Sequence, residues 1–248
     1  MIEEVSEKNN YETYDFFVGR ISPFLLFEMD YHGLFNLAES HKEETAFRNP
    51  NQAAEVVVIA MVAYFEAFCK HQFAAIVNIL PSLLPVFTSK RNQPEIQISS
   101  VISLDGDFEK NIGFVLAEKY DFGSAKSING LFRDLLLISP FSEDEAIKFN
   151  TILYKRNLLV HHAGFYTLQY LKENSMPDEI KNKAFKEGIS IDTEECHEIC
   201  DFLFHMAIKI TKETSNALKL RMAKSTGLNE TQIKASEELY RAIYDILE

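Results

Sequence analysis

Residues 49–80 read NPNQAAEVVVIAMVAYFEAFCKHQFAAIVNIL, and their apolar side chains recur at intervals of three and four positions. This spacing places them along one side of an α-helix and predicts a long helix in the core of the fold. Asn49 can cap the helix, and Pro50 suits its first position. Gln52 can complete a capping box. Pro81 lacks a backbone donor, so we expect the helix to end just before it.

Helical periodicity extends through most of the chain on both sides of this segment. Runs that alternate at every second residue are scarce, and the strand-like stretch 95–104 lies within the polar segment 88–106, which we expect to be a loop. We interpret residues 172–190, rich in Lys and Glu, as a connection. Cap signals and periodicity predict further helices at 23–40, 108–120, 127–138, 142–163, 193–224 and 229–247. The expected fold class is therefore all-α.

The chain is long enough for one good core, and no internal repeat or clear linker divides it. We predict a single helical domain over residues 1–248. Within it we expect a helical N-terminal extension at 1–48, a core bundle at 49–224 and a C-terminal helix at 225–248.

The charge balance limits the classes of partner. Asp and Glu number 37 against 25 Lys and Arg, which gives a net charge of -12. This balance argues against broad binding of nucleic acid, which needs a basic surface. It leaves room for a small local cationic site and for a basic partner protein.

Cysteine content and the N-terminus predict a cytoplasmic protein. Three cysteines do not make a disulfide framework. The acidic start of the chain lacks the apolar segment of a signal peptide. The longest apolar run, Val56 to Phe65, is closed by Glu66, so we expect no membrane span.

The main chemical signal is RNLLVHHAG at residues 156–164, where an apolar helical segment meets a glycine. An Arg with a His five to seven residues later is expected by chance roughly 0.6 times in this chain. Requiring Asn directly after the Arg lowers that expectation to about a few per cent. A cation, a carboxamide and an imidazole together can hold a phosphodiester and move protons without a metal.

Helix geometry separates the residues of this motif. At about 100° per residue, Arg156 and His161 lie about 140° apart around one helix. If they cooperate, either the helix unwinds before His161 or the site is assembled with a second chain. Arg156 falls among apolar positions, whereas His161 shares its side of the helix with Asn157. His162 lies beside lysines, so we favour His161 of the two histidines.

A purely structural interpretation of the motif stays open. Arg156 could pair with a buried carboxylate such as Glu66, and His161 could cap the C-terminal end of the helix, where the helix dipole favours a cation.

The segment Arg156-Asn157-Leu158-Leu159-Val160-His161 resembles the Arg-polar-x-x-x-His signature of the HEPN superfamily. Tyr64-Phe65-Glu66-Ala67-Phe68, in the middle of the long early helix, also resembles this family. The likeness covers about residues 50–220 and includes the order of the helices. HEPN domains are helical bundles, usually dimeric, and many are metal-independent endoribonucleases of toxin–antitoxin, abortive-infection and other defence systems.

The resemblance implies a site that two copies of the chain form together. Arg156 and His161 would be the catalytic pair, and Asn157 and His162 would bind or orient RNA phosphate. Glu66 would be a partner of Arg156. The reaction would be attack of the RNA 2′-OH on the adjacent phosphate, with no metal and no cofactor. Alternatives are an inactive HEPN-like interaction or scaffold module, and a chain that needs a partner, such as an antitoxin, to complete or silence its activity.

A second constellation, Cys196-His197-x-x-Cys200, has a spacing that could suit zinc. The same cysteines fall in an apolar stripe with Ile199 and Leu203, which is typical of a helix packed on a core. We therefore predict structural cysteines and no metal site.

Overall fold

The computed structural model describes residues 22–40, 52–91, 96, 101–102, 108–173 and 184–247. Within these ranges there is no strand, and the one β-bridge joins Phe165 to Gly188. The predicted all-α fold class is confirmed. The elements are α2 (Pro23–Ser40), α3 (Gln52–Ile79), η1 (Pro81–Leu83), α4 (Leu84–Ser89), α6 (Phe108–Ala117), α7 (Ala125–Leu136), α8 (Glu143–His162), α9 (Leu168–Glu173), α11 (Thr193–Met222) and α12 (Glu230–Leu247).

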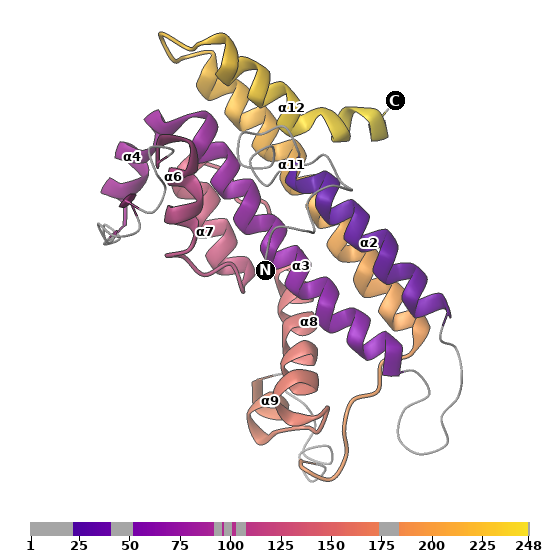
Figure 1. Cartoon of the computed structure of the whole chain (residues 1–248). Coiled ribbons are helices and arrows are strands. Elements are labelled where there is room, and N and C mark those ends of the chain that lie inside the picture. Colours follow the sequence, from indigo (N-terminus) through magenta and orange to yellow (C-terminus); the bar gives the residue numbers. More distant parts are fainter. Residues whose placement is uncertain are drawn as a thin grey trace.

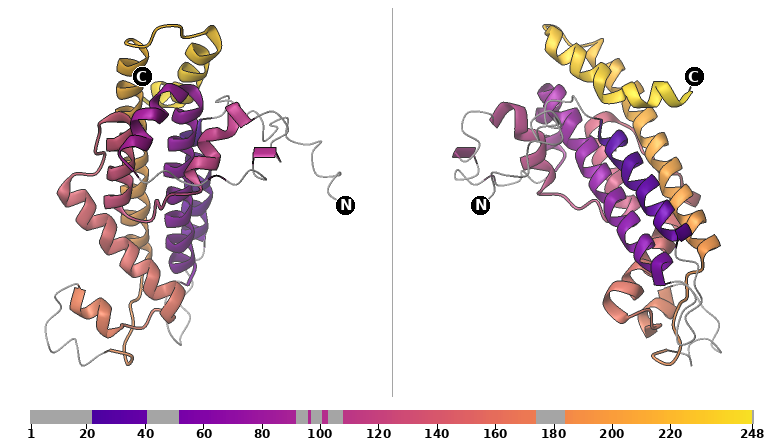
Figure 2. Two further views of the ribbon diagram at one scale, coloured as in Figure 1. Left: turned by 90° about the vertical axis from the view of Figure 1, so that its left-hand side faces the viewer. Right: turned by 45° about the vertical axis from the view of Figure 1, so that its right-hand side comes forward.

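Helix α3 is the centre of the bundle. It packs against α2, α6, α8 and α11, and Figures 1 and 2 show α2, α3 and α11 side by side along most of their length. The ring of Phe65, at the middle of α3, has its centroid 5.9 Å from that of Phe27 and 5.4 Å from that of Phe149. The amide of Gln72 donates to the Thr214 hydroxyl at 3.0 Å and joins α3 to α11 inside the core. The apolar face predicted for residues 49–80 thus organises the whole bundle.

Helix α2 is part of this bundle, although it falls within the predicted N-terminal extension. Phe24 and Phe27 are buried in the main core. The Tyr31 ring stacks on Phe204 of α11 with centroids 4.4 Å apart, and its hydroxyl donates to Asp201 at 2.7 Å. These contacts fix α2 against α11 as well as α3.

Cap hydrogen bonds confirm three of the predicted helix starts, whereas α7 begins at Ala125, two residues before its predicted start, with Ser124 as its cap. Ser142 accepts from the Glu145 N–H, and the Glu145 carboxylate accepts from the Ser142 N–H, so α8 begins with a complete capping box. Asp192 caps α11 by accepting from the Glu195 N–H at 2.8 Å. Asn229 and Gln232 form reciprocal hydrogen bonds at the start of α12. The Asn49 and Pro50 signals for α3 lie outside the described residues.

Some elements differ from the sequence predictions. Helix α9 was missed, because its six residues are too few to show a periodicity. The chain also turns helical again directly after α3, in η1 and α4, because proline is tolerated in the first turn of a helix. Val101 and Ile102 are helical, although they fall in the strand-like stretch; most of residues 88–106 lies outside the described ranges.

Helix α3 is long and apolar enough to cross a membrane by length and composition alone. One 18-residue window has a mean hydropathy of 1.6, and 44% of that window is buried inside the bundle. The apolar helix continues through Glu66 to Ile79. Helix length therefore does not exclude a span, and the absence of a membrane contact stays a prediction.

Candidate functional site

The motif 156–164 occupies the last two turns of α8 and the turn that follows. The helix continues to His162, Ala163 takes the left-handed conformation with φ +49°, and Gly164 follows with φ +79°. The Gly164 N–H donates to the carbonyl of Leu158 at 2.8 Å and closes the helix end. Because the helix does not unwind before His161, the separation of about 140° between Arg156 and His161 stands.

Arg156 points to the inner side of α8, toward α3. Its Nη2 donates to Oε1 of Glu66 at 2.6 Å, and the two side chains are 23% and 27% exposed. Phe149 and Ile152, on the same side of α8, are buried. The pairing of Arg156 with Glu66 that the sequence suggested is confirmed. It supplies the partner that a guanidinium needs at such a position.

The surroundings of Glu66 disfavour its charged form. Burial raises the pKa of this carboxyl, the Arg156 guanidinium lowers it, and the nearby Asp121 carboxylate raises it again, with a net upward shift. A Cβ at Gly123 would stand 3.0 Å from Oδ1 of Asp121 and 3.6 Å from Oε1 of Glu66, so both carboxylates border this glycine. The site is therefore one cation beside two acidic groups.

Asp121, the second acidic group beside Arg156, was not predicted from the sequence. Its Oδ1 accepts from the Gly123 N–H at 2.9 Å, and its Oδ2 accepts from the Ser127 hydroxyl at 3.4 Å. In sequence this pattern indicates only a turn before a helix. Asp121 lies in the loop between α6 and α7, and no signal in the chain connects it with residue 66 in α3.

Arg156 has a hydrogen-bond donor, Nε, that the ion pair with Glu66 does not use. Its Nε is buried and has no hydrogen-bond partner within the described part of the chain. Because Nη2 is already bonded to Glu66, an anion arriving at this guanidinium would compete with that carboxylate.

His161, His162 and Asn157 lie on the solvent side of α8. All three are exposed, and the two imidazole rings are 6.5 Å apart with planes at 72°. Arg156 and His161 of one chain thus do not converge on a common point. The position of the two histidines in the last turn also suits a cation at a helix C-terminus.

A small apolar cluster supports this end of α8. Leu158 packs with Tyr170 and Leu171 of α9, and the Tyr166 ring stacks on Tyr170 at 5.6 Å. The N–H of Tyr166 donates to the Glu187 carbonyl at 3.0 Å. Sequence reasoning did not identify this cluster, since its members come from α8, from α9 and from the segment before α11.

The cysteine pair on α11 has a core position. Cys196 and Cys200 are buried in the apolar face of the helix, as predicted. The hydrogen bond with Cys196 and burial both raise the pKa of the Cys200 thiol. Among the described residues no group of three or more His, Cys, Asp or Glu side chains is arranged to hold a metal ion.

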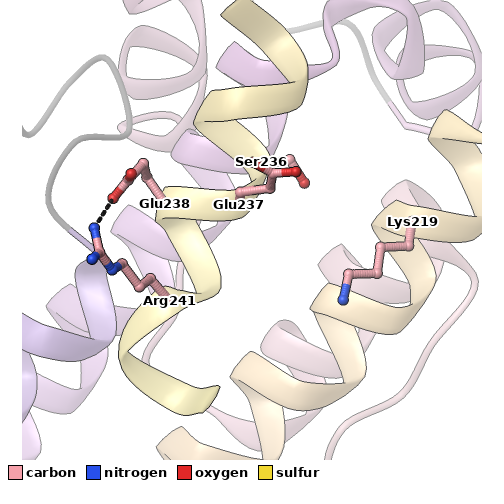
Figure 3. Close-up of a pocket in the computed structure, with 5 residues that line it drawn as sticks. All are labelled: Lys219, Ser236, Glu237, Glu238 and Arg241. Carbon is pink, nitrogen blue, oxygen red and sulfur yellow. Dashed lines mark ion pairs between the residues drawn. The ribbon is translucent and has the colours of Figure 1, made fainter. Parts of the chain in front are cut away.

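A pocket of about 350 Å³ lies between α11 and α12. Figure 3 shows Lys219 of α11 opposite Glu237 of α12, with Glu238 and Arg241 facing each other across an ion pair of 3.5 Å. None of the motif residues lines this pocket.

Comparison with known proteins gave no matching family model, no matching curated protein and no matching solved structure. The likeness to HEPN domains therefore rests on the sequence motifs alone.

Proposed function

We propose that this chain is a metal-independent endoribonuclease of HEPN type that acts as a homodimer. The observation that supports this proposal best is the continuous helix α8, which carries Arg156 on its inner side and exposed His161 at its end. Because the two side chains diverge within one chain, a reaction that uses both requires a second copy to bring them together.

The reaction would be transesterification within RNA. A 2′-OH loses its proton to one His161 imidazole and attacks the adjacent phosphorus in line. The phosphate passes through a state with added negative charge, which Arg156 stabilises. The bond to the 5′ oxygen breaks, and that oxygen takes up the proton that the same His161 imidazole received. The products are a 2′,3′-cyclic phosphate and a 5′-OH, and Asn157 and His162 would contact the phosphate.

The same proposal includes the location of the protein, the system in which it acts and its partner. The chain would act in the cytoplasm without a membrane, in a bacterial toxin–antitoxin, abortive-infection or other defence system. The net charge of -12 would favour an antitoxin or other partner that presents a basic surface.

Cleavage of total RNA in EDTA tests this function. Wild-type protein should cleave and His161→Ala should not. His205→Ala is the control, because this exposed imidazole lies on α11 outside the motif and its loss should leave cleavage close to that of wild type. Identical residual cleavage by wild type and His161→Ala would show that the proposal is wrong.

The second candidate is a catalytically inactive HEPN-like interaction or scaffold module. The observation that favours it is the ion pair of Arg156 with Glu66, which gives the arginine a structural role. In that case Arg156→Ala lowers the melting temperature, and pure protein at high concentration gives no cleavage product that His161→Ala removes.

A further inference from the structure

Phe185 is an exposed aromatic residue with an unusual backbone conformation. Its side chain is 64% exposed and its φ is +61°. A bulky residue at positive φ is strained, and such residues concentrate at functional sites. Leu137 and Ala163, the other non-glycine residues with positive φ in the described ranges, end α7 and α8 as left-handed caps. Phe185 ends none of the helices that the structure describes.

Backbone hydrogen bonds fix the turn of Phe185 to the segment that leaves α8. The Phe185 N–H donates to the carbonyl of Tyr166 at 2.8 Å, and the Ile189 N–H donates to the carbonyl of Gly164 at 2.9 Å. Gly164 comes two residues after His162. The turn therefore lies at the end of α8 that carries the two histidines, beside α9 in Figure 1.

Cationic side chains accompany this aromatic ring. Lys172 on α9 and Lys186 in the turn are exposed, and neither has a hydrogen-bond or ion-pair partner among the described residues. Glu187 is also exposed nearby, so the surface is not uniformly basic. Exposed aromatic rings with flanking cations are the means by which proteins hold unpaired nucleic-acid bases and their phosphates.

We propose that Phe185 stacks on an unpaired base of the RNA bound at the His161 site, so that the substrate class is single-stranded RNA. This inference rests on the proposed ribonuclease function. A base in a duplex is already stacked on both faces and has no free face for the ring, whereas a base in a single strand or loop can turn toward it. The ring is 64% exposed and is therefore available for this contact.

The test is binding of a fluorescently labelled single-stranded oligoribonucleotide of about 12 nucleotides, a length within the usual site size. His161→Ala is the parent protein, so that the probe stays intact. Phe185→Leu in this parent should weaken binding between about fivefold and about 150-fold, which is the range for loss of one base stack. Phe185→Tyr keeps an aromatic face and should bind within about twofold of the parent.

Two further probes separate stacking from charge. An oligomer of equal length with abasic positions keeps the phosphates, and the Phe185 variants should bind it as the parent does. A double-stranded probe should show no dependence on the ring. If Phe185→Leu binds the single strand as tightly as the parent, or if no protein binds it at all, the stacking proposal is overturned.

Thermal unfolding checks that Phe185 is not needed for the fold. Phe185→Gly removes the ring and relieves the positive φ, so its melting temperature should equal or exceed that of the parent, while its RNA affinity falls. A melting temperature below that of the parent would indicate a structural ring and would overturn the proposal.

The outcomes distinguish this inference from the proposed function. Cleavage that requires His161 but is indifferent to Phe185→Leu leaves the ribonuclease standing and refutes the stacking contact. Ring-dependent binding of single strands by a wild-type protein that never cleaves RNA refutes the ribonuclease and supports the stacking contact.

Discussion

The guanidinium of Arg156 donates to the carboxylate of Glu66 at 2.6 Å and so connects α8 with α3 in the half-buried interior of the bundle. This pair predicts a stability cost for Arg156→Ala, because the variant leaves a half-buried carboxylate without its cation. Loss of a hydrogen bond to a charged group costs about 1.5–3 kcal/mol. Urea unfolding should show this decrease in the free energy of unfolding. Asn157→Ala, on the exposed side of the same helix, is the control and should change the free energy by less than about 0.5 kcal/mol.

The raised pKa of Glu66 predicts how stability depends on pH. The folded state binds the proton more tightly than the unfolded state, whose carboxyl titrates near 4.5. The stability that the neutral carboxyl contributes is complete below that pH and is lost as the pH rises through the folded pKa. The melting temperature of wild type minus that of Glu66→Gln should therefore fall from pH 4 upward and then become constant.

Asp121→Asn provides the control for this pH dependence. It removes the acidic neighbour that raises the pKa of Glu66. The melting-temperature difference caused by Glu66→Gln should therefore fall less with rising pH when it is measured in the Asp121→Asn protein. A melting-temperature difference that rises between pH 4 and pH 7 would contradict the assignment, since it would mean that the folded pKa of Glu66 is lowered.

The contact between Gly188 and Gly164 predicts a requirement for glycine. A Cβ at residue 188 would stand 2.7 Å from the Gly164 carbonyl oxygen, and the atoms it would meet, in Gly164 and Phe165, are all backbone, which leaves little room for adjustment. Gly188→Ala should lower the free energy of unfolding by about 1–3 kcal/mol and disturb the turn that carries Phe185. Amide hydrogen exchange of Tyr166 and Ile189, whose N–H groups bond across this contact, should quicken.

Gly33 is the opposite case and serves as the control. It lies inside α2, and a Cβ there would have no atom within 4 Å. Gly33→Ala should raise the free energy of unfolding by about 0.5–1 kcal/mol, because alanine is the better helix former. Equal effects at residues 33 and 188 would refute the steric argument.

Local signals explain why so much of the fold was predictable from sequence. The capping box of Ser142 and Glu145 and the cap at Asp192 involve residues three positions apart, so they can be read without knowing the fold. The same holds for the apolar periodicity of α3, which extends over many turns. Helix α9 is too short for either signal, so the sequence did not reveal it.

The candidate site was predictable only in part, for the same reason. Arg156 was placed on the core side of its helix from spacing alone, and that placement pointed to a carboxylate partner. Asp121 and Phe185 reach their positions through contacts between segments far apart in the chain, such as the hydrogen bond from the Phe185 N–H to the Tyr166 carbonyl. Spacing along one helix carries no information about such contacts.

The separation of Arg156 and His161 around α8 predicts complementation between two inactive variants. If each site takes Arg156 from one chain and His161 from the other, a dimer of Arg156→Ala with His161→Ala keeps one intact site. Random assortment of equal amounts of the two variants makes half of all dimers mixed. Each mixed dimer has one intact site and one site that lacks both residues. Unfolding and refolding the variants together should therefore restore about a quarter of the wild-type cleavage rate.

The matched control is each variant refolded alone, which should stay inactive at every concentration. A mixture that is also inactive, although mass spectrometry detects mixed dimers, would contradict this division of the site between chains. Recovery that falls on dilution, in step with the loss of dimers, would instead tie the activity to the second copy. That outcome follows from the geometry, because the continuous helix keeps His161 away from Arg156 of the same chain.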